Sequence, residues 1–132
     1  MTTEKRTPSP YTPSILVVDD DTEIRVSFRR TLEEVGYFVS VAANGREAWK
    51  LVVDRFFDLL ILDLSMPEED GIELIRSIVT ELPQIKIIAV SGFLEGTLLR
   101  IAKNLGAIST LHKPVAENLL LSAVCEVLAK QR

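Results

Sequence analysis

The sequence contains very little cysteine and histidine. Among its 132 residues, Cys125 is the only cysteine and His112 the only histidine. An internal disulfide is therefore impossible, and His112 has no second imidazole or thiol in its neighbourhood with which it could bind a metal. Cys125 lies in an apolar run with helical spacing, where we expect either a small core residue or a contact with a partner.

Clustered basic residues and long apolar runs are also absent. The chain has 15 Lys and Arg against 19 Asp and Glu, which makes the formal net charge -4 at pH 7. Because nucleic-acid binding requires a basic surface, we expect no direct contact with nucleic acid. No apolar run reaches the ~18 residues of a membrane span, and the first residues lack the apolar core of a secretory signal. We therefore expect a cytoplasmic protein that is not inserted in a membrane.

The sequence divides into a short polar start and one domain. Residues 1–13 are polar and contain three of the six prolines, so we expect a flexible N-terminal tail there. Residues 14–132 are long enough to bury one core, and the 47% hydrophobic composition is ordinary for a globular domain. Because no further segment follows the last expected helix, we expect a stand-alone domain without an output module.

Within the domain, short apolar runs alternate with segments of helical period. Strands are predicted over residues 14–18, 37–42, 59–62, 86–90 and 109–112, and helices over residues 22–35, 45–53, 71–82, 96–105 and 116–130. Continuous apolar strands, with no polar alternation, are typical of a parallel sheet covered on both faces. The predicted fold class is α/β: a flavodoxin-like three-layer sandwich whose five parallel strands have the order 2-1-3-4-5.

Chemically reactive side chains stand just after four of these strands. They are Asp19 and Asp20, Asp63, Ser91 and Lys113. The carboxyl ends of parallel strands share one edge of the sheet, so these residues should meet in one pocket. Crowded carboxylates repel each other and must take up a proton or bind a cation. Oxygen ligands of this kind favour Mg²⁺, which is the predicted cofactor.

A carboxylate in such a pocket can also act as a nucleophile toward phosphorus. Phosphoryl transfer depends mainly on fixed positive and donor groups around the reacting oxygens. The Lys113 ammonium and the Ser91 hydroxyl are suited to that role. Asp63 is the predicted nucleophile, because it ends the central strand and is followed by a loop over residues 63–70.

Four motifs together resemble the receiver domain of bacterial two-component response regulators, as found in stand-alone regulators of the chemotaxis type. They are ILVVDDD, LLILDLSMPEEDG, IIAVSG and GAISTLHKP, and the resemblance covers residues 14 to about 130. It implies that Asp63 is the phosphorylated aspartate. It also implies that Asp20 binds the metal directly, while Asp19 acts largely through water.

The resemblance assigns roles to the remaining motif residues. Ser65 would offer its backbone carbonyl to the metal, Ser91 would be the switch hydroxyl, and Lys113 would bind the phosphate. The bond from Lys113 to Pro114 would be cis. Thr110 departs from the family, which often has Tyr or Phe at this position, so we expect an unusual readout of phosphorylation.

The resemblance implies a signalling phosphoacceptor, with self-phosphorylation and self-dephosphorylation chemistry, rather than a dedicated enzyme. Asp63 would accept a phosphoryl group from a histidine kinase or a histidine phosphotransfer protein, with Mg²⁺. Phosphorylation of Asp63 would shift an equilibrium between two conformations of the face formed by residues 96–105, 109–112 and 116–130. A downstream protein target would recognise that face, and a homodimer is a further expected assembly.

Three other functions and one simpler interpretation remain open from the residues. A phosphatase of the haloacid dehalogenase type needs a second acid two residues after its nucleophile, where this chain has Ser65. A flavodoxin-like mononucleotide binder needs small hydroxyl and glycine residues after the first strand, where this chain has acids; a phosphorylation-independent scaffold is the third possibility. Asp19, Asp20 and Asp21 can also simply begin a helix, which is our interpretation of Asp21.

Overall fold

The computed structural model describes residues 12–66, 71–92 and 96–130, and in them five strands alternate with five helices. The strands are β1 (Ser14–Val18), β2 (Phe38–Ala42), β3 (Leu59–Asp63), β4 (Lys86–Ser91) and β5 (Ser109–His112). The helices are α1 (Thr22–Glu34), α2 (Gly45–Asp54), α3 (Gly71–Glu81), α4 (Thr97–Leu105) and α5 (Glu117–Ala129). Most of the expected tail, residues 1–13, lies outside the described residues, as does part of the loop expected over residues 63–70.

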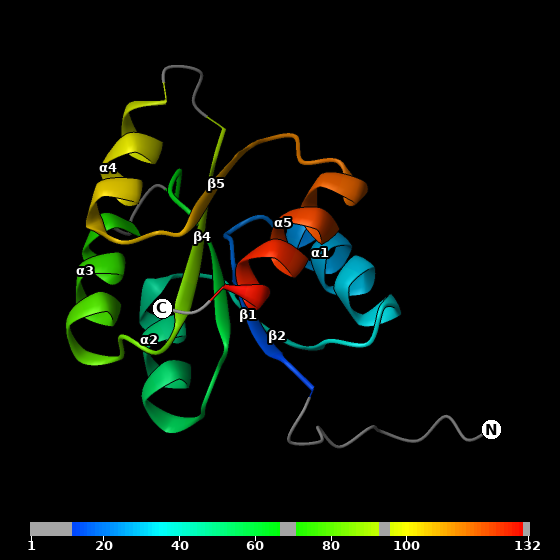
Figure 1. Ribbon diagram of the computed structural model, residues 1–132, viewed down its shortest axis with the longest axis horizontal. Coiled ribbons are helices and arrows are strands. Elements are labelled where there is room, and N and C mark those ends of the chain that lie inside the picture. Colours follow the sequence, from blue (N-terminus) through cyan, green and yellow to red (C-terminus); the bar gives the residue numbers. More distant parts are fainter. Residues whose placement is uncertain (1–11, 67–70, 93–95, 131–132) are drawn as a thin grey trace.

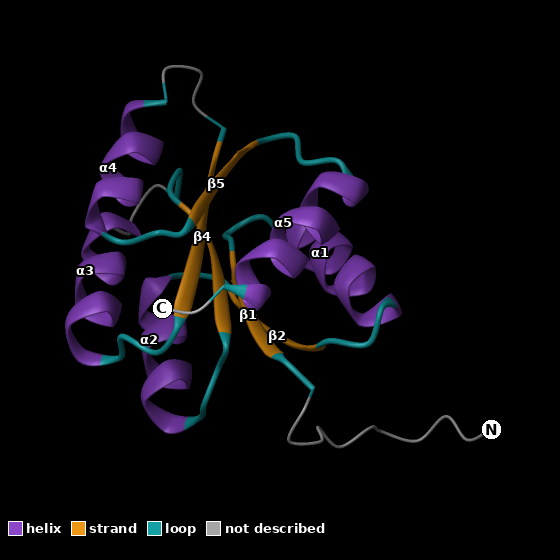
Figure 2. Cartoon of the chain, in the orientation of Figure 1, coloured by secondary structure: helices purple, strands orange, loops and turns teal. Residues whose placement is uncertain are grey.

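All four strand pairings are parallel, and the strand order is β2-β1-β3-β4-β5. Helices α1 and α5 cover one face of the sheet, and α2, α3 and α4 cover the other (Figures 1 and 2). The predicted fold class and strand order are confirmed. The winding of the sheet reverses between β1 and β3, which places the end of β1 beside the end of the central strand.

Several predicted boundaries were wrong by one residue. Strand β3 runs on through Asp63, because this residue still pairs in register with Val90 of β4. Helix α2 reaches Asp54. Its start agrees with the prediction, since the Asn44 side chain accepts a hydrogen bond from the Glu47 N–H at 2.9 Å. Glu47 in turn accepts from the Ala43 N–H at 2.7 Å, so the two residues before the helix are both bonded to its first turn.

The core lies on both faces of the sheet and is thickest around β3. All five residues of β3 are buried, including the charged Asp63. One apolar cluster fills the face under α2, α3 and α4, and a second lies under α1 and α5. Asp63 is therefore held by a rigid strand that is packed on both sides.

The structure decides where Cys125 lies, for which the sequence left a core position and a partner contact open. Cys125 is exposed on α5, so a place in the core is excluded. Leu119, on the same helix, is 56% exposed. Trp49 is partly buried against the core cluster, as a packing residue would be. Within the described residues, no helix is both long and apolar enough to span a bilayer.

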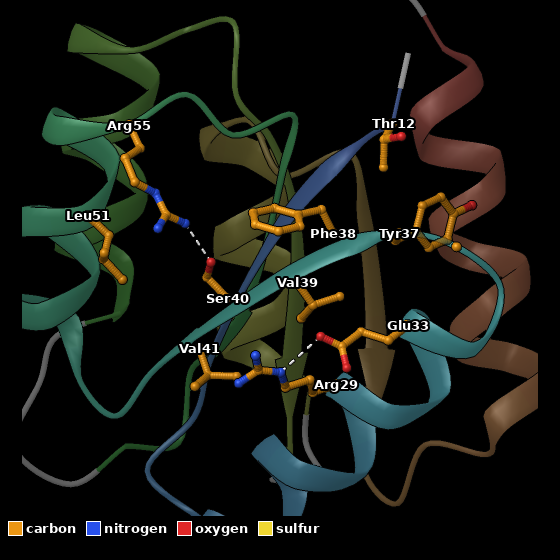
Figure 3. A pocket seen from close by; sticks show the side chains of 11 residues that line it. Thr12, Arg29, Glu33, Tyr37, Phe38, Val39, Ser40, Val41, Leu51 and Arg55 are labelled. Carbon is orange, nitrogen blue, oxygen red and sulfur yellow. Dashed lines mark hydrogen bonds and ion pairs between the residues drawn. The ribbon is translucent and has the colours of Figure 1, made fainter. Parts of the chain in front are cut away.

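Strand β2 forms one edge of the sheet, since it pairs only with β1. A groove of about 680 Å³ follows this edge between α1 and α2 (Figure 3). At one end of the groove, Arg55 donates to the Ser40 hydroxyl at 2.5 Å. Its guanidinium also lies over the Phe57 ring, 5.0 Å from the centroid. Phe57 is thus held by the core and by a cation on its outer side.

Phe57 and its neighbour Phe56 offer a matched test of this packing. Phe57 is fully buried and Phe56 is 62% exposed. We expect Phe57→Ala to lower the free energy of unfolding by about 3–5 kcal/mol, because it leaves a cavity. Phe56→Ala should change it by no more than about 0.5 kcal/mol. Urea unfolding followed by circular dichroism measures both, and similar losses in the two variants would contradict the packing described.

Candidate functional site

The first two acids follow β1 directly. Asp19 is buried, and its backbone N–H continues the sheet by donating to the Ala42 carbonyl at 3.1 Å. Its Oδ1 atom accepts from the Asp21 N–H at 2.9 Å. Asp20, the next residue, is exposed. Asp21 caps α1 by accepting from the Glu23 N–H, as predicted.

The third acid, Asp63, ends the central strand. Its Oδ1 atom accepts from the Ser65 N–H at 2.9 Å, which fixes the carboxylate in one orientation. The Leu64 N–H continues the pairing with β4 by donating to the Val90 carbonyl at 2.8 Å. The backbone just after Asp63 is therefore held by β4, and the Asp63 carboxylate is held by the N–H of Ser65, at the carboxyl end of β3.

Lys113 links the ends of β1 and β3. Its Nζ atom lies 2.9 Å from Asp19 Oδ2 and 3.2 Å from Asp63 Oδ2. Its backbone N–H donates to the Ser91 carbonyl at 2.9 Å, and the following bond to Pro114 is cis, as the resemblance implied. One ammonium thus contacts two buried carboxylates that are 44 residues apart in the sequence.

Burial has the largest influence on the charges of this site. It raises the pKa of the Asp19 carboxyl above the ordinary value of 3.8, although the Asp21 N–H and the Lys113 ammonium favour the charged form. For Lys113, burial disfavours the ammonium. The hydrogen bond to Asp19 and the charges of Asp63 and Asp19 together outweigh that effect, so the pKa of Lys113 is raised above 10.5.

Three acidic side chains form one candidate cation site. Asp19, Asp20 and Asp63 each offer a carboxylate oxygen, and these oxygens all lie within 4.8 Å of one another. When all are ionised, three carboxylates against one ammonium leave a formal charge of -2. An oxygen-only, negatively charged ligand set suits a hard divalent cation such as Mg²⁺. The donor set therefore fits the predicted cofactor.

Ser91 is the buried last residue of β4 and pairs in register with His112. The next residue, Gly92, donates its N–H to the Ser65 hydroxyl at 3.1 Å. This contact joins the loop after β3 to the end of β4. The metal-binding role predicted for the Ser65 carbonyl and the switch role of Ser91 remain predictions, whereas Asp19, Asp20, Asp63 and Lys113 lie together.

Sequence reasoning missed one residue next to this cluster. Arg25, on α1, donates from Nη1 to the Asp19 carbonyl at 2.7 Å. A weak signal was available, because an arginine one turn after a helix N-cap can turn back toward the loop before the helix. The spacing between Arg25 and the acids in the sequence did not distinguish Arg25 from a helix residue that faces solvent.

The family comparison agrees with this geometry. The model of the response regulator receiver domain matches residues 15–125. The chain belongs to this family. Protein CcdB of Bacillus subtilis is 36% identical over 115 residues, which cover 86% of this receiver and 96% of that protein.

Solved structures of receivers share the fold. A CheY-like receiver domain protein from Methanospirillum hungatei is 34% identical, with a TM-score of 0.84, and the match covers 89% of this chain and 94% of that one. The beryllofluoride-activated NtrC4 receiver domain dimer is 32% identical, with a TM-score of 0.82 and coverage of 87% and 95%. In three longer curated relatives, the receiver spans only 14%, 23% and 27% of the protein.

One departure from the family is placed by the structure. Thr110 is partly buried on β5 and pairs in register with Ala89. A threonine has no ring that could swing between an inward and an outward position. In this receiver, an aromatic ring at this position therefore cannot couple the site to β5.

The raised pKa of Asp19 predicts how stability changes with pH. The folded state holds the Asp19 proton more tightly than the unfolded state does, so this residue contributes stability below pH 3.8 and loses it as the pH rises through the raised pKa. In metal-free buffer, Asp19→Asn should therefore gain stability relative to the wild type between pH 3.8 and neutrality. Urea unfolding at both ends of that range measures the difference. A difference that does not change with pH would contradict this assignment.

Proposed function

We propose that this receiver accepts a phosphoryl group on Asp63, with Mg²⁺, from a histidine kinase or a histidine phosphotransfer protein. The observation that carries the proposal is the meeting of Asp63, Lys113 and two further acids at one sheet edge. Asp63 is buried at the end of the central strand, with an ammonium 3.2 Å from one of its oxygens. That is a carboxylate surrounded by groups able to stabilise a transferring phosphoryl group.

The proposed metal ligands are Asp19, Asp20, Asp63 and the backbone carbonyl of Ser65, with Asp19 acting largely through water. When bound, Mg²⁺ would neutralise charge on the phosphoryl oxygens. The carboxylate oxygens near one another support this assignment for the three acids. For Ser65, support comes from its position two residues after Asp63, on the loop that the Asp63 carboxylate itself anchors.

The protein side of the reaction is simple. One Asp63 carboxylate oxygen forms a bond to phosphorus as the bond from phosphorus to the donor imidazole nitrogen breaks. The electron pair of the broken bond stays on the imidazole. The Ser65 N–H orients the Asp63 carboxylate, and Lys113 offsets negative charge as it develops. Slow hydrolysis of the acyl phosphate by water would restore the free carboxylate and end the signal.

We propose that the signal spreads through the end of β4. The Ser91 carbonyl accepts from the Lys113 N–H, and Gly92 donates to Ser65, so this strand end is bonded to both sides of the site. A phosphoryl group on Asp63 would compete for Lys113 and draw the Ser91 hydroxyl toward it. The shift would change the populations of two states in the face made by α4, β5 and α5.

That face offers apolar residues to a downstream protein target. Ile101 on α4 is 38% exposed and Leu119 on α5 is 56% exposed. The NtrC4 receiver in its activated form is a dimer, so a homodimer is one proposed assembly of this receiver. Direct binding to nucleic acid is not proposed, because the net charge is -4.

The first test is covalent. With acetyl phosphate and Mg²⁺, we expect the intact mass of the wild type to rise by one phosphoryl group, and we expect no such rise for Asp63→Asn. Beryllofluoride should shift amide signals of α4, β5 and α5 in the wild type alone. Phosphorylation that persists in Asp63→Asn would refute the proposal. Rapid turnover of many phosphomonoesters would favour the haloacid dehalogenase type of phosphatase instead.

The metal site has its own test, with a control one residue away. We expect Asp20→Asn to weaken Mg²⁺ binding by about tenfold or more, because it removes a charged ligand. Asp21→Asn also removes one negative charge but keeps the helix cap, so it should change the affinity much less. Mg²⁺ titrations followed by amide chemical shifts measure both variants. Equal losses would show that Asp20 contributes only its general charge.

A further inference from the structure

Arg25 contacts the peptide unit that joins the two acids of the β1–α1 loop. Its Nη1 atom donates to the Asp19 carbonyl at 2.7 Å, and this carbonyl belongs to the bond between Asp19 and Asp20. Its Nη2 atom donates to the Thr22 hydroxyl at 3.1 Å, at the start of α1. The guanidinium therefore bridges the end of β1 and the first turn of α1. Its backbone N–H also donates to the Asp21 carbonyl at 3.0 Å.

The three carboxylates of the site are not restrained in the same way. Asp19 is held by Lys113 and by the Asp21 N–H, and Asp63 is held by Lys113 and by the Ser65 N–H. The Asp20 side chain is exposed and makes no hydrogen bond or ion pair to any residue that the structure describes. Its position is therefore set by the backbone on which it stands. Arg25 is the side chain that holds the carbonyl of that backbone unit.

We propose that Arg25 is a positioning residue for the divalent cation, acting through the backbone of Asp20. The guanidinium restrains the peptide between Asp19 and Asp20, and so keeps the Asp20 carboxylate within reach of the other two. Restraint before binding lowers the entropy lost when the ion binds. The inference rests on the proposed function, because it assumes that these acids bind Mg²⁺.

Charge and restraint make opposite predictions for this residue. Arg25 is a cation near a cation site, so if it acted by charge alone, its removal would strengthen Mg²⁺ binding. If it acts by restraint, its removal weakens binding. The direction of the change therefore separates the two explanations. Arg25→Leu removes both the charge and the two hydrogen bonds, while Arg25→Lys keeps the charge but not the planar two-point contact.

Arg29 provides the control on the same helix. It lies one turn further along α1, and its guanidinium points to Glu33 of the same helix, at 3.0 Å, beside β2 (Figure 3). Arg29→Leu removes the same charge from an exposed pair that does not contact the acidic loop. We expect its effect on Mg²⁺ affinity to be small.

The experiment is a Mg²⁺ titration of the full chain, followed by amide chemical shifts, with urea unfolding to confirm that each variant is folded. We expect about tenfold weaker binding for Arg25→Leu and a loss in the same direction for Arg25→Lys. The decisive step is a double-mutant cycle. In the Asp20→Asn background, Arg25→Leu should have little further effect on the affinity, because the carboxylate that Arg25 positions is gone.

The outcomes are distinct. Unchanged or tighter binding in Arg25→Leu overturns the inference, as does an equal loss with and without the Asp20 carboxylate. If Arg25→Leu does not fold, Arg25→Lys decides, since wild-type affinity in that variant also overturns the inference. A wild type that binds no Mg²⁺ removes the proposed function as well. Normal phosphorylation of Asp63 together with unaltered Mg²⁺ binding in the Arg25 variants leaves the proposed function standing and removes only this inference.

Discussion

The Lys113 ammonium, in contact with both Asp19 and Asp63, is the interaction on which the site depends. Two buried carboxylates at the ends of adjacent strands would repel each other strongly without a cation between them. Lys113 comes from a third part of the chain, after β5, and so joins the end of this edge strand to the ends of β1 and β3. The same ammonium that stabilises the acids is positioned to meet a phosphoryl group, so stability and proposed function use the same side chain.

The apolar core on both faces of the sheet holds these charged residues in place. Buried ion pairs lose much of their Coulombic attraction to desolvation. Here the desolvated charges of Asp19 and Asp63 lie at the ends of strands rather than at their centres, and the fully buried β3 keeps Asp63 in place. Hydrogen bonds from backbone N–H groups satisfy one oxygen of each buried acid. The remaining oxygens are left for the ammonium and for a cation.

Much of the fold was predictable because the signals are local. Continuous apolar runs such as ILVV and LLIL identify buried parallel strands, and Asn44 marks the beginning of a helix by its own side chain. Strand ends were less predictable. Asp63 belongs to β3 because Val90 continues the pairing on the neighbouring strand, and no local pattern contains that information. Cys125 was also undecided, since an apolar helical run does not specify which of its residues face the core.

By itself, the sequence determined the α/β class and the acids and lysine placed at the strand ends, because the alternation of apolar runs and helical segments can be read along the chain. The strand order was predicted from the general rule for right-handed crossovers, and the structure confirms it. Only the tertiary structure decided that one lysine contacts two carboxylates, that Asp20 is exposed while Asp19 is buried, and that Arg25 holds the peptide between them. Those facts depend on how segments far apart in the sequence approach one another and on how α1 packs against the sheet. Local sequence patterns do not specify either, because tertiary packing determines both.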